Sequence, residues 1–276
     1  MLSIALGATS FSFVACSGAI TDDLFEPNRL GYLDPTTGEP ESPQLEALSP
    51  DTDLVSLTIG GNDVGLVQII PNCVVAFVGF VPLSGNPQCA DDPTLTASTA
   101  TRLRALAGDE PGTTPQGKPI HSIRSVIEAI HERAPAARIL IAGYPHVAGH
   151  IGRLQLCHVG RIGLTNLPIV GTADANLILS RANALFGNRL IDNLNAVIRE
   201  AVEEVAKQGI AVSYVDVRRA FAGHGLCDRF TPWIDDVVGT IDANPLRVRI
   251  DRESFHPTAA GQRANQYAFL SALAAP

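Results

Sequence analysis

Short apolar runs recur along the chain, each about the length of one buried strand. Three of them span Leu54–Ile59, Ile139–Gly143 and Ile210–Val217, and Thr9–Cys16 has the same character. Short continuous apolar runs are typical of strands in a parallel sheet, because such a sheet is covered on both faces. The pattern therefore predicts buried parallel strands at these four places.

Helical periodicity separates these runs. In Ser122–His131 the apolar residues fall on one helical face, and Asp174–Gln208 repeats that spacing over a long segment that stops before Gly209. Thr258–Leu273 is rich in alanine and follows Pro257. Strands that alternate with helices predict a doubly wound, three-layer α/β fold with a mainly parallel sheet.

Long segments rich in glycine and proline connect the predicted elements. They span Asp23–Pro43, Cys73–Pro93 and Tyr144–Thr172. Loops of this length in a compact domain often carry function, so we expect them to cover the active-site face rather than to link domains. The sequence shows neither an internal repeat nor a domain boundary, which predicts a single domain over residues 1–276.

The net charge of the chain disfavours some classes of binding partner. The net charge is −8 and hydrophobic residues make up 46% of the chain. An acidic chain without a Lys/Arg cluster is a poor partner for nucleic acid or for an anionic membrane surface. No apolar run reaches the roughly 18 residues that span a bilayer, so we expect no transmembrane segment.

Cysteine usage bears on the compartment. The five cysteines are Cys16, Cys73, Cys89, Cys157 and Cys227. No CxxC or Cys/His pair has metal-ligand spacing, so the sequence predicts no metal site, and nothing in it implies a cofactor. Cysteines that close loops fit disulfides and an oxidising compartment, and scattered reduced thiols are the alternative. The odd count leaves one cysteine over.

One strand runs directly into a polar, glycine-rich turn. The segment Leu57–Asp63 reads Leu-Thr-Ile-Gly-Gly-Asn-Asp, and ligands of α/β sheets bind at the carboxyl ends of strands. The side-chain amide of Asn62 could donate to a developing oxyanion. The alternative is an ordinary turn followed by a helix cap. Asp63 fits either a capping role or a role in holding this loop.

Two further segments could join the same pocket. His256 stands just before a predicted helix and three residues after Glu253, an arrangement that suits a general base oriented by a carboxylate. Gly18 ends the strand-like run at Cys16 and offers an unhindered backbone N–H. Without other support, His256 could equally be a structural histidine at a helix start.

These three pieces, in this order, resemble the SGNH hydrolases, the GDSL-type esterases and lipases, and above all their secreted actinobacterial lipase and phospholipase-like branch. The likeness covers most of the chain and rests on the following stretches: SFSFVACSGA, LVSLTIGGNDVG, AGYP, GHGLCD, PWI and SFHPTAAGQRA. The resemblance implies a flavodoxin-like fold and hydrolysis of carboxylic esters.

The resemblance also implies roles for single residues. Gly18 and Asn62 match the oxyanion donors, and His256 matches the catalytic base. Glu253 takes the position of the family's usual aspartate, and it would orient His256 by its side chain, by its carbonyl or not at all. We expect His224 to order a loop near the pocket, and Trp233 to line an acyl pocket or to fill core.

One block of the family pattern does not occur in this sequence. Gly-Asp-Ser, which carries the nucleophile in the family, is absent, and Ser17 is its nearest substitute in a place that does not match. The branch has three sequential disulfides, which here implies Cys73–Cys89 and Cys157–Cys227 and leaves Cys16 without its partner.

Both gaps suggest an N-terminally shortened domain without its first, central strand, through a mis-assigned start or a true truncation. We expect the loss to expose two neighbouring strands and to lower stability.

Two interpretations of the function follow. The first is a secreted, monomeric lipase-, esterase- or phospholipase-type enzyme that acts on a small-molecule or lipid ester. The second is an inactive remnant or acyl-binding protein that keeps the pocket. The apolar opening of the chain resembles a secretion or lipoprotein signal, but it lacks the positive charge that a signal carries, so we expect interior sequence there and no signal peptide.

Overall fold

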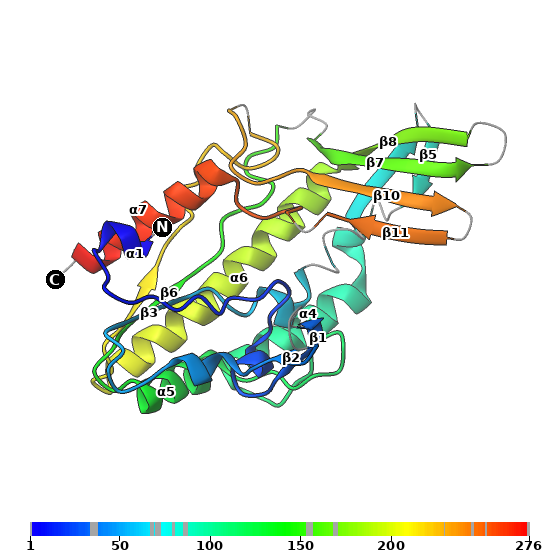
Figure 1. Ribbon diagram of the computed structural model, residues 1–276. Coiled ribbons are helices and arrows are strands. Elements are labelled where there is room, and N and C mark those ends of the chain that lie inside the picture. Colours follow the sequence, from blue (N-terminus) through cyan, green and yellow to red (C-terminus); the bar gives the residue numbers. More distant parts are fainter. Residues whose placement is uncertain are drawn as a thin grey trace.

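The computed structural model describes residues 2–33, 38–66, 69, 73–78, 81–84, 88–152, 157–167, 171–228, 230–243, 246–251 and 253–274. Within them the chain forms a parallel sheet flanked by helices and a second, mixed sheet that extends away from this body (Figure 1).

The parallel sheet contains three of the four predicted strands. β3 (Leu54–Leu57), β6 (Arg138–Ala142) and β9 (Val212–Val215) lie in the order β3-β6-β9, and both pairings are parallel. β6 is central and almost entirely buried, whereas β3 lies at an edge and is half-buried. The apolar runs are therefore confirmed as strands, and their carboxyl ends share one edge of the sheet.

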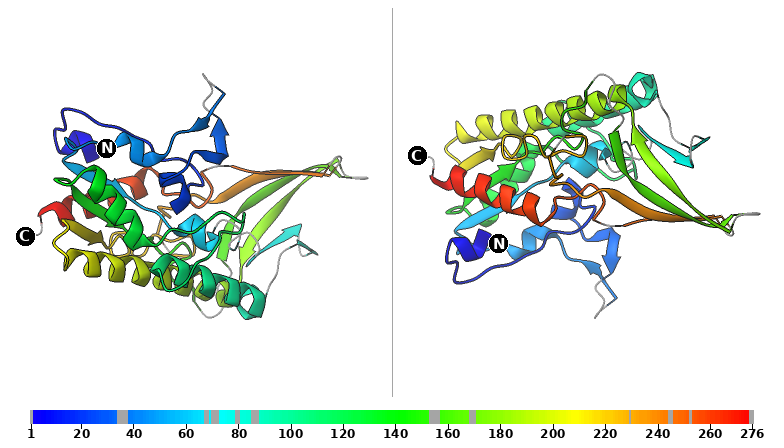
Figure 2. Two further views of the ribbon diagram at one scale, coloured as in Figure 1. Left: turned by 90° about the horizontal axis from the view of Figure 1, so that it is seen from below. Right: turned by 90° about the horizontal axis from the view of Figure 1, so that it is seen from above.

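Helices cover both faces of this sheet. α5 (Ile123–Arg133) and α6 (Arg181–Ala206) pack together, and α6 packs on β9. Figure 2 shows α7 (Ala259–Ala274) on the other side of the sheet from α6. This three-layer arrangement confirms the predicted fold class. α4 (Pro93–Ala107), capped by the Asp92 side chain, packs beside α6.

The long helix starts later than its periodicity suggested. The predicted span Asp174–Gln208 is wrong at its start, because residues 174–179 belong to a strand and α6 begins after the Ser180 cap. In β8 (Gly171–Leu179), Ala175, Leu177 and Leu179 are buried with a period of two. Six residues are too few to separate that period from the helical one in a sequence.

Two segments that we predicted as loops supply three strands of the second sheet, β4, β5 and β7. Its order is β11-β10-β7-β8-β4-β5, and only the β10–β7 pairing is parallel. The strands are β4 (Val74–Val78), β5 (Val81–Ser84), β7 (Cys157–Leu167), β10 (Val237–Ala243) and β11 (Leu246–Ile250). The loop interpretation of residues 73–93 and 144–172 is thus wrong over these strands. In β7 the register shifts between His158 and Gly160, and such a bulge breaks the alternation that identifies a strand.

The first apolar segment does not form its predicted strand. After α1 (Leu2–Ala5), residues 8–16 carry no regular secondary structure, and Phe11 and Phe13 are 59% and 75% exposed. A strand needs a neighbour for its backbone hydrogen bonds, and no strand pairs with this segment in the described part of the chain. The prediction for Thr9–Cys16 is therefore wrong as to a paired, buried strand.

The remaining elements are short. They are η1 (Thr21–Leu24), β1 (Asn28–Leu33), β2 (Pro40–Glu41), η2 (Gln44–Ala47), α2 (Gly61–Val64) and η3 (Cys89–Asp91). Parts of the predicted loop Asp23–Pro43 thus pair as β1 and β2, and its residues 34–37 lie outside the described residues.

Two disulfides close loops of very different length. Cys73 bonds to Cys89 across 16 residues, and Cys157 bonds to Cys227 across 70 residues. Cys16 is a free thiol whose pKa is raised to about 12, mainly by burial. Both implied pairings are present, and Cys16 is the cysteine left over. No helix in the described ranges is long and apolar enough to cross a membrane.

Candidate functional site

The glycine-rich turn after β3 is shaped by close packing. Gly60 has φ +105°, a left-handed conformation that favours glycine. The Gly61 N–H donates to Tyr144 Oη at 2.9 Å, and a Cβ on Gly61 would lie 3.0 Å from the Tyr144 ring. The turn therefore brings Asn62 to a fixed place at the carboxyl edge of the parallel sheet.

Asn62 lies beside the segment that carries Gly18. Its Nδ2 donates to the Ala19 carbonyl oxygen at 2.9 Å and keeps one further N–H to offer. Gly18 is exposed with φ +80°, and no hydrogen bond of its N–H is found in the described part of the chain. The structure thus brings the two predicted oxyanion segments together, with one N–H donor on each.

Tyr144 and Asn195 support this turn, although we predicted no role for either residue from the sequence. Asn195 accepts from the Tyr144 N–H at 2.7 Å and donates to the Tyr144 carbonyl at 2.9 Å. Burial raises the pKa of the Tyr144 hydroxyl, which keeps it protonated. The stretch AGYP, where β6 ends, was the available signal for Tyr144, whereas Asn195 is one polar residue inside a long helix.

The imidazole of His256 is oriented by a backbone carbonyl. Its Nδ1 lies 3.2 Å from the Ser254 carbonyl oxygen. A carbonyl can only accept, so Nδ1 carries the proton, and Nε2 of the neutral ring keeps a lone pair. The residue is exposed. This is the tautomer in which Nε2 can take a proton from a nucleophile.

The backbone around His256 is held by the segment Trp233–Asp235. The Asp235 N–H donates to the His256 carbonyl at 2.8 Å, and the Thr258 N–H donates to the Trp233 carbonyl at 2.9 Å. Phe255 adds a third bond, from its N–H to the Asp235 carbonyl at 3.0 Å. These bonds fix the loop on both sides of the imidazole.

Trp233 is held in turn by aromatic contacts. Its ring stacks on His224, with centroids 3.6 Å apart, and meets the Phe221 ring edge-on at 6.1 Å. Trp233 is half-buried against the hydrophobic core. Of the two alternatives for Trp233, the packing favours core, and His224 contacts this loop through its ring.

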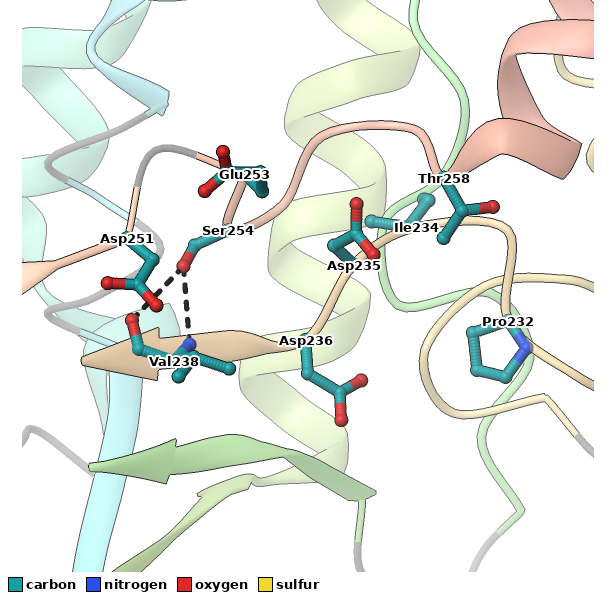
Figure 3. A pocket seen from close by; sticks show the side chains of 9 residues that line it. All are labelled: Pro232, Ile234, Asp235, Asp236, Val238, Asp251, Glu253, Ser254 and Thr258. Carbon is teal, nitrogen blue, oxygen red and sulfur yellow. Dashed lines mark hydrogen bonds between the residues drawn. The ribbon is translucent and has the colours of Figure 1, made fainter. Parts of the chain in front are cut away.

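Glu253 lies on the same loop but apart from the imidazole nitrogen. Its backbone carbonyl accepts from the His256 backbone N–H at 2.8 Å, whereas its carboxylate forms no hydrogen bond with the ring in the described residues. The side chain lines an open pocket of about 370 Å³ (Figure 3). The other residues that line the pocket are Pro232, Ile234, Asp235, Asp236, Val238, Asp251, Ser254 and Thr258.

Ser254 is anchored in this pocket wall. Figure 3 shows its side chain turned toward Val238, where its Oγ accepts from the Val238 N–H at 3.2 Å. Ser254 is buried, and this contact fixes the residue whose carbonyl orients His256. Ser254 is thus a site residue that the sequence did not single out. The sequence suggested only that a backbone carbonyl, expected at Glu253, could orient His256.

An apolar cavity links the His256 loop to the Asn62 turn. Phe255, next to His256, and Leu66, which follows α2, both line a cavity of about 30 Å³. Phe255 has φ +63°, which is strained for a bulky side chain, and its ring packs on the core. Residues next to the two loops therefore share one small apolar cavity.

Other candidate groups have partners of their own. His121 lies 3.2 Å from Asp22, and His146 lies 2.8 Å from Asp192. A search of the described ranges finds no cluster of three or more His, Cys, Asp or Glu side chains that could hold a metal. Ser17, the nearest substitute for the nucleophile, is exposed in the turn before Gly18.

Known proteins share this chain's sequence and fold. A model of the GDSL-like lipase/acylhydrolase family matches residues 1–264. Lipase 1 of Streptomyces coelicolor is 29% identical over 96% of this chain and 71% of its own length. The lipase of Streptomyces rimosus is 30% identical over 92% of this chain and 66% of its own length. The chain thus spans about two thirds of these relatives.

Two solved structures are similar over nearly the whole chain. The crystal structure of phospholipase A1 from Streptomyces albidoflavus matches with a TM-score of 0.62 and 26% identity, over 98% of this chain and 83% of that one. The extracellular lipase from Streptomyces rimosus matches with a TM-score of 0.60 and 26% identity, over 98% and 85%. With the family model matching residues 1–264, this chain belongs to the GDSL-like lipase/acylhydrolase family and is by family a hydrolase of ester bonds.

Proposed function

We propose that these 276 residues supply the base and two oxyanion donors of a Ser-His carboxylic-ester hydrolase of lipase, esterase or phospholipase type. The observation that carries the proposal is the contact of His256 Nδ1 with the Ser254 carbonyl, which leaves Nε2 free to act as base. Family membership and the lipase relatives support the reaction class.

Each residue has one role in the proposed reaction. A serine hydroxyl attacks the ester carbonyl while His256 Nε2 takes its proton, and the same nitrogen returns the proton to the leaving alcohol. The Gly18 N–H and the remaining Asn62 N–H hold the oxyanion, each worth about 3 kcal/mol in the transition state. Water activated by His256 then releases the acid.

The Ser254 carbonyl takes the orienting role in this proposal. It holds the imidazole in the basic tautomer and stabilises the imidazolium that forms during attack. Glu253 contributes its carboxylate to the pocket wall and its backbone to the turn. The substrate is a small-molecule or lipid ester, and the oxyanion donors serve any such ester equally.

The nucleophile is the open element of the proposal. The sequence contains no Gly-Asp-Ser, so these residues alone should hydrolyse esters poorly. That absence also supports a second candidate, an acyl-binding protein without turnover. Hydrolysis of a p-nitrophenyl ester separates the candidates, measured for the chain alone and for the chain fused to a Gly-Asp-Ser segment of an active relative.

The expected result is turnover in the fusion and very little in the chain alone. In the fusion, His256→Ala should lower kcat at least roughly a thousandfold, and Asn62→Ala should lower it roughly a hundredfold or more. A folded fusion without turnover would favour the acyl-binding alternative. Turnover by the chain alone that Ser17→Ala abolishes would place the nucleophile in the Gly18 turn and overturn this assignment.

We further infer one monomeric domain over residues 1–276 that acts outside the cell without a nucleic-acid partner. A single hydrophobic cluster that joins residues of both sheets supports one domain. The two disulfides and the extracellular relative support secretion, and the net charge of −8 disfavours nucleic acid. One cooperative unfolding transition and a monomeric mass in solution would test the domain and the assembly state.

A further inference from the structure

The two oxyanion segments are tied to each other by a buried carboxylate next to Asn62. Asp63 Oδ1 accepts from the Thr21 N–H at 3.0 Å and from the Thr21 hydroxyl at 2.6 Å. Asp63 Oδ2 lies 3.1 Å from the same N–H. Thr21 follows Gly18 by three residues, so one residue pair spans the gap between the two loops.

Both partners are completely buried, and the direction of their bond is fixed. Asp63 and Thr21 have no exposed surface. The Thr21 hydroxyl accepts from the His121 N–H at 2.9 Å, so its own proton goes to Asp63. The Thr21 hydroxyl therefore has a defined partner both as a donor and as an acceptor, which makes the contact rigid.

The helix that carries Asn62 and Asp63 is too short to be stable without contacts to other segments. α2 spans Gly61–Val64, and both flanking residues, Gly60 and Gly65, have positive φ. A single turn of helix is marginal by itself, because nucleation costs more than the first hydrogen bond returns. The position of Asn62 thus depends on the contacts that its neighbours make with other segments.

We propose that Asp63 is a positioning residue of the ester-hydrolysing site, acting through Thr21 to set the placement of the Gly18 N–H relative to the Asn62 side-chain amide. This inference rests on the proposed function of Gly18 and Asn62. Asp63 makes no contact with the reacting atoms in this assignment, and its effect reaches the oxyanion only through the two loops.

The tether should respond to pH. The pKa of Asp63 is raised to about 6, mainly by burial and to a lesser degree by the nearby Asp23 carboxylate, whereas the bonds from Thr21 oppose the rise. The other titratable groups near the tether are the Tyr144 hydroxyl and the His121 ring, which contacts Asp22. A proton on Asp63 removes one acceptor, so the Thr21 contact loosens as the carboxyl becomes neutral.

NMR of the isotope-labelled chain tests the proposal without any need for turnover. We follow the Gly18 backbone amide, the Asn62 side-chain NH2 and the Asp63 carboxyl carbon between pH 4.5 and 8. We expect both donor signals to shift with the midpoint of the Asp63 carboxyl. Thr21→Val and Asp63→Asn should displace both donor signals, whereas Thr21→Ser, which keeps the hydroxyl, should leave them near the parent positions.

Thr99→Val is the matched control, because Thr99 is also buried and its hydroxyl donates to Leu95 within α4. It should leave the Gly18 and Asn62 signals in place. The proposal is overturned if folded Thr21→Val leaves both signals unchanged, or if Thr21→Ser displaces them as far as Thr21→Val does.

If the variants do not fold, the pH titration of the unsubstituted protein tests the proposal independently. Donor signals that ignore the Asp63 titration overturn the proposal, and signals that follow it support the proposal. Failure of the fusion to hydrolyse esters would instead overturn the proposed function and leave these NMR results intact.

Discussion

His256 Nδ1 lies 3.2 Å from the carbonyl oxygen of Ser254. The imidazole is therefore oriented by its own chain two residues upstream. The carboxylate of Glu253 lines the neighbouring pocket, although its spacing suits the usual orienting acid. A backbone carbonyl carries no titratable proton, so this orienting contact does not depend on the charge of a carboxylate.

This relationship predicts different effects for two adjacent substitutions. Glu253→Ala should leave the proton on His256 Nδ1, because the exposed carboxylate makes no bond with the ring. Ser254→Ala removes the hydroxyl that holds Val238, at a cost of about 1 kcal/mol, and should let the carbonyl shift and mix the tautomers. The 15N shifts of the ring nitrogens report the tautomer. A tautomer change in Glu253→Ala alone would contradict the assignment.

The buried carboxylate of Asp63 predicts a pH-dependent stability. Its pKa is raised from 3.8 to about 6 in the folded chain, so between these values the folded state binds more protons than the unfolded state. The contribution of Asp63 to stability is therefore greatest below pH 4 and falls as pH rises through 6. Over the whole pH range, this difference between the folded and unfolded pKa corresponds to about 3 kcal/mol.

Urea denaturation at pH 4.5 and pH 7.5 measures this effect. Asp63→Asn should make the stability difference between the two pH values smaller by about 2 kcal/mol, because pH 4.5 already lies above the unfolded pKa of 3.8. Asp23, whose pKa is also raised by burial, remains in both proteins and contributes its own pH dependence to each. An unchanged pH dependence in Asp63→Asn would show that this carboxyl does not titrate between the two values.

The two disulfides should differ in their contribution to stability. In the chain-entropy model, a loop of 70 residues contributes roughly 4 kcal/mol and a loop of 16 residues roughly 3 kcal/mol. The Cys157→Ala/Cys227→Ala pair should thus lower the free energy of unfolding by about 1 kcal/mol more than the Cys73→Ala/Cys89→Ala pair. Urea denaturation of both pairs is the measurement, and the opposite order would be inconsistent with the entropic account.

A glycine in α7 predicts a movement of the Trp233–His256 region. A Cβ on Gly261 would lie 2.3 Å from the Trp233 carbonyl, which accepts from Thr258. Gly261→Ala should therefore displace that carbonyl, destabilise the chain by about 1–3 kcal/mol and change the fluorescence of its single tryptophan.

Gly187→Ala is the matched control for this substitution. Gly187 also lies in a helix, and an added Cβ there meets nothing within 4 Å. It should be neutral or stabilise the chain by up to about 1 kcal/mol, because alanine favours the helix. Equal losses in the two variants would mean that the Trp233 contact is not the cause.

Local patterns were sufficient for the three strands of the parallel sheet and for helix α5. The apolar runs at β3, β6 and β9 and the amphipathic face of α5 required only local sequence. The segments around Gly18, Asn62 and His256 could also be recognised in the sequence, because each lies at the end or just before the start of a predicted element. The second sheet could not be recognised in this way. The bulge in β7 and the short length of β8 obscure the alternation of buried and exposed residues that identifies a strand.

The sequence by itself determined the kinds of side chain at the site, and its resemblance to a known family implied the fold, the reaction class and the two cysteine pairs, since all of these depend on residue types and their order. Only the tertiary structure decided that Ser254, Tyr144 and Asp63 support the site. Their contacts join residues that are far apart in the chain, or depend on a backbone carbonyl that every residue carries. The exposure of Phe11 and Phe13 was decided in the same way, since burial of an apolar segment needs a partner that its own sequence cannot specify.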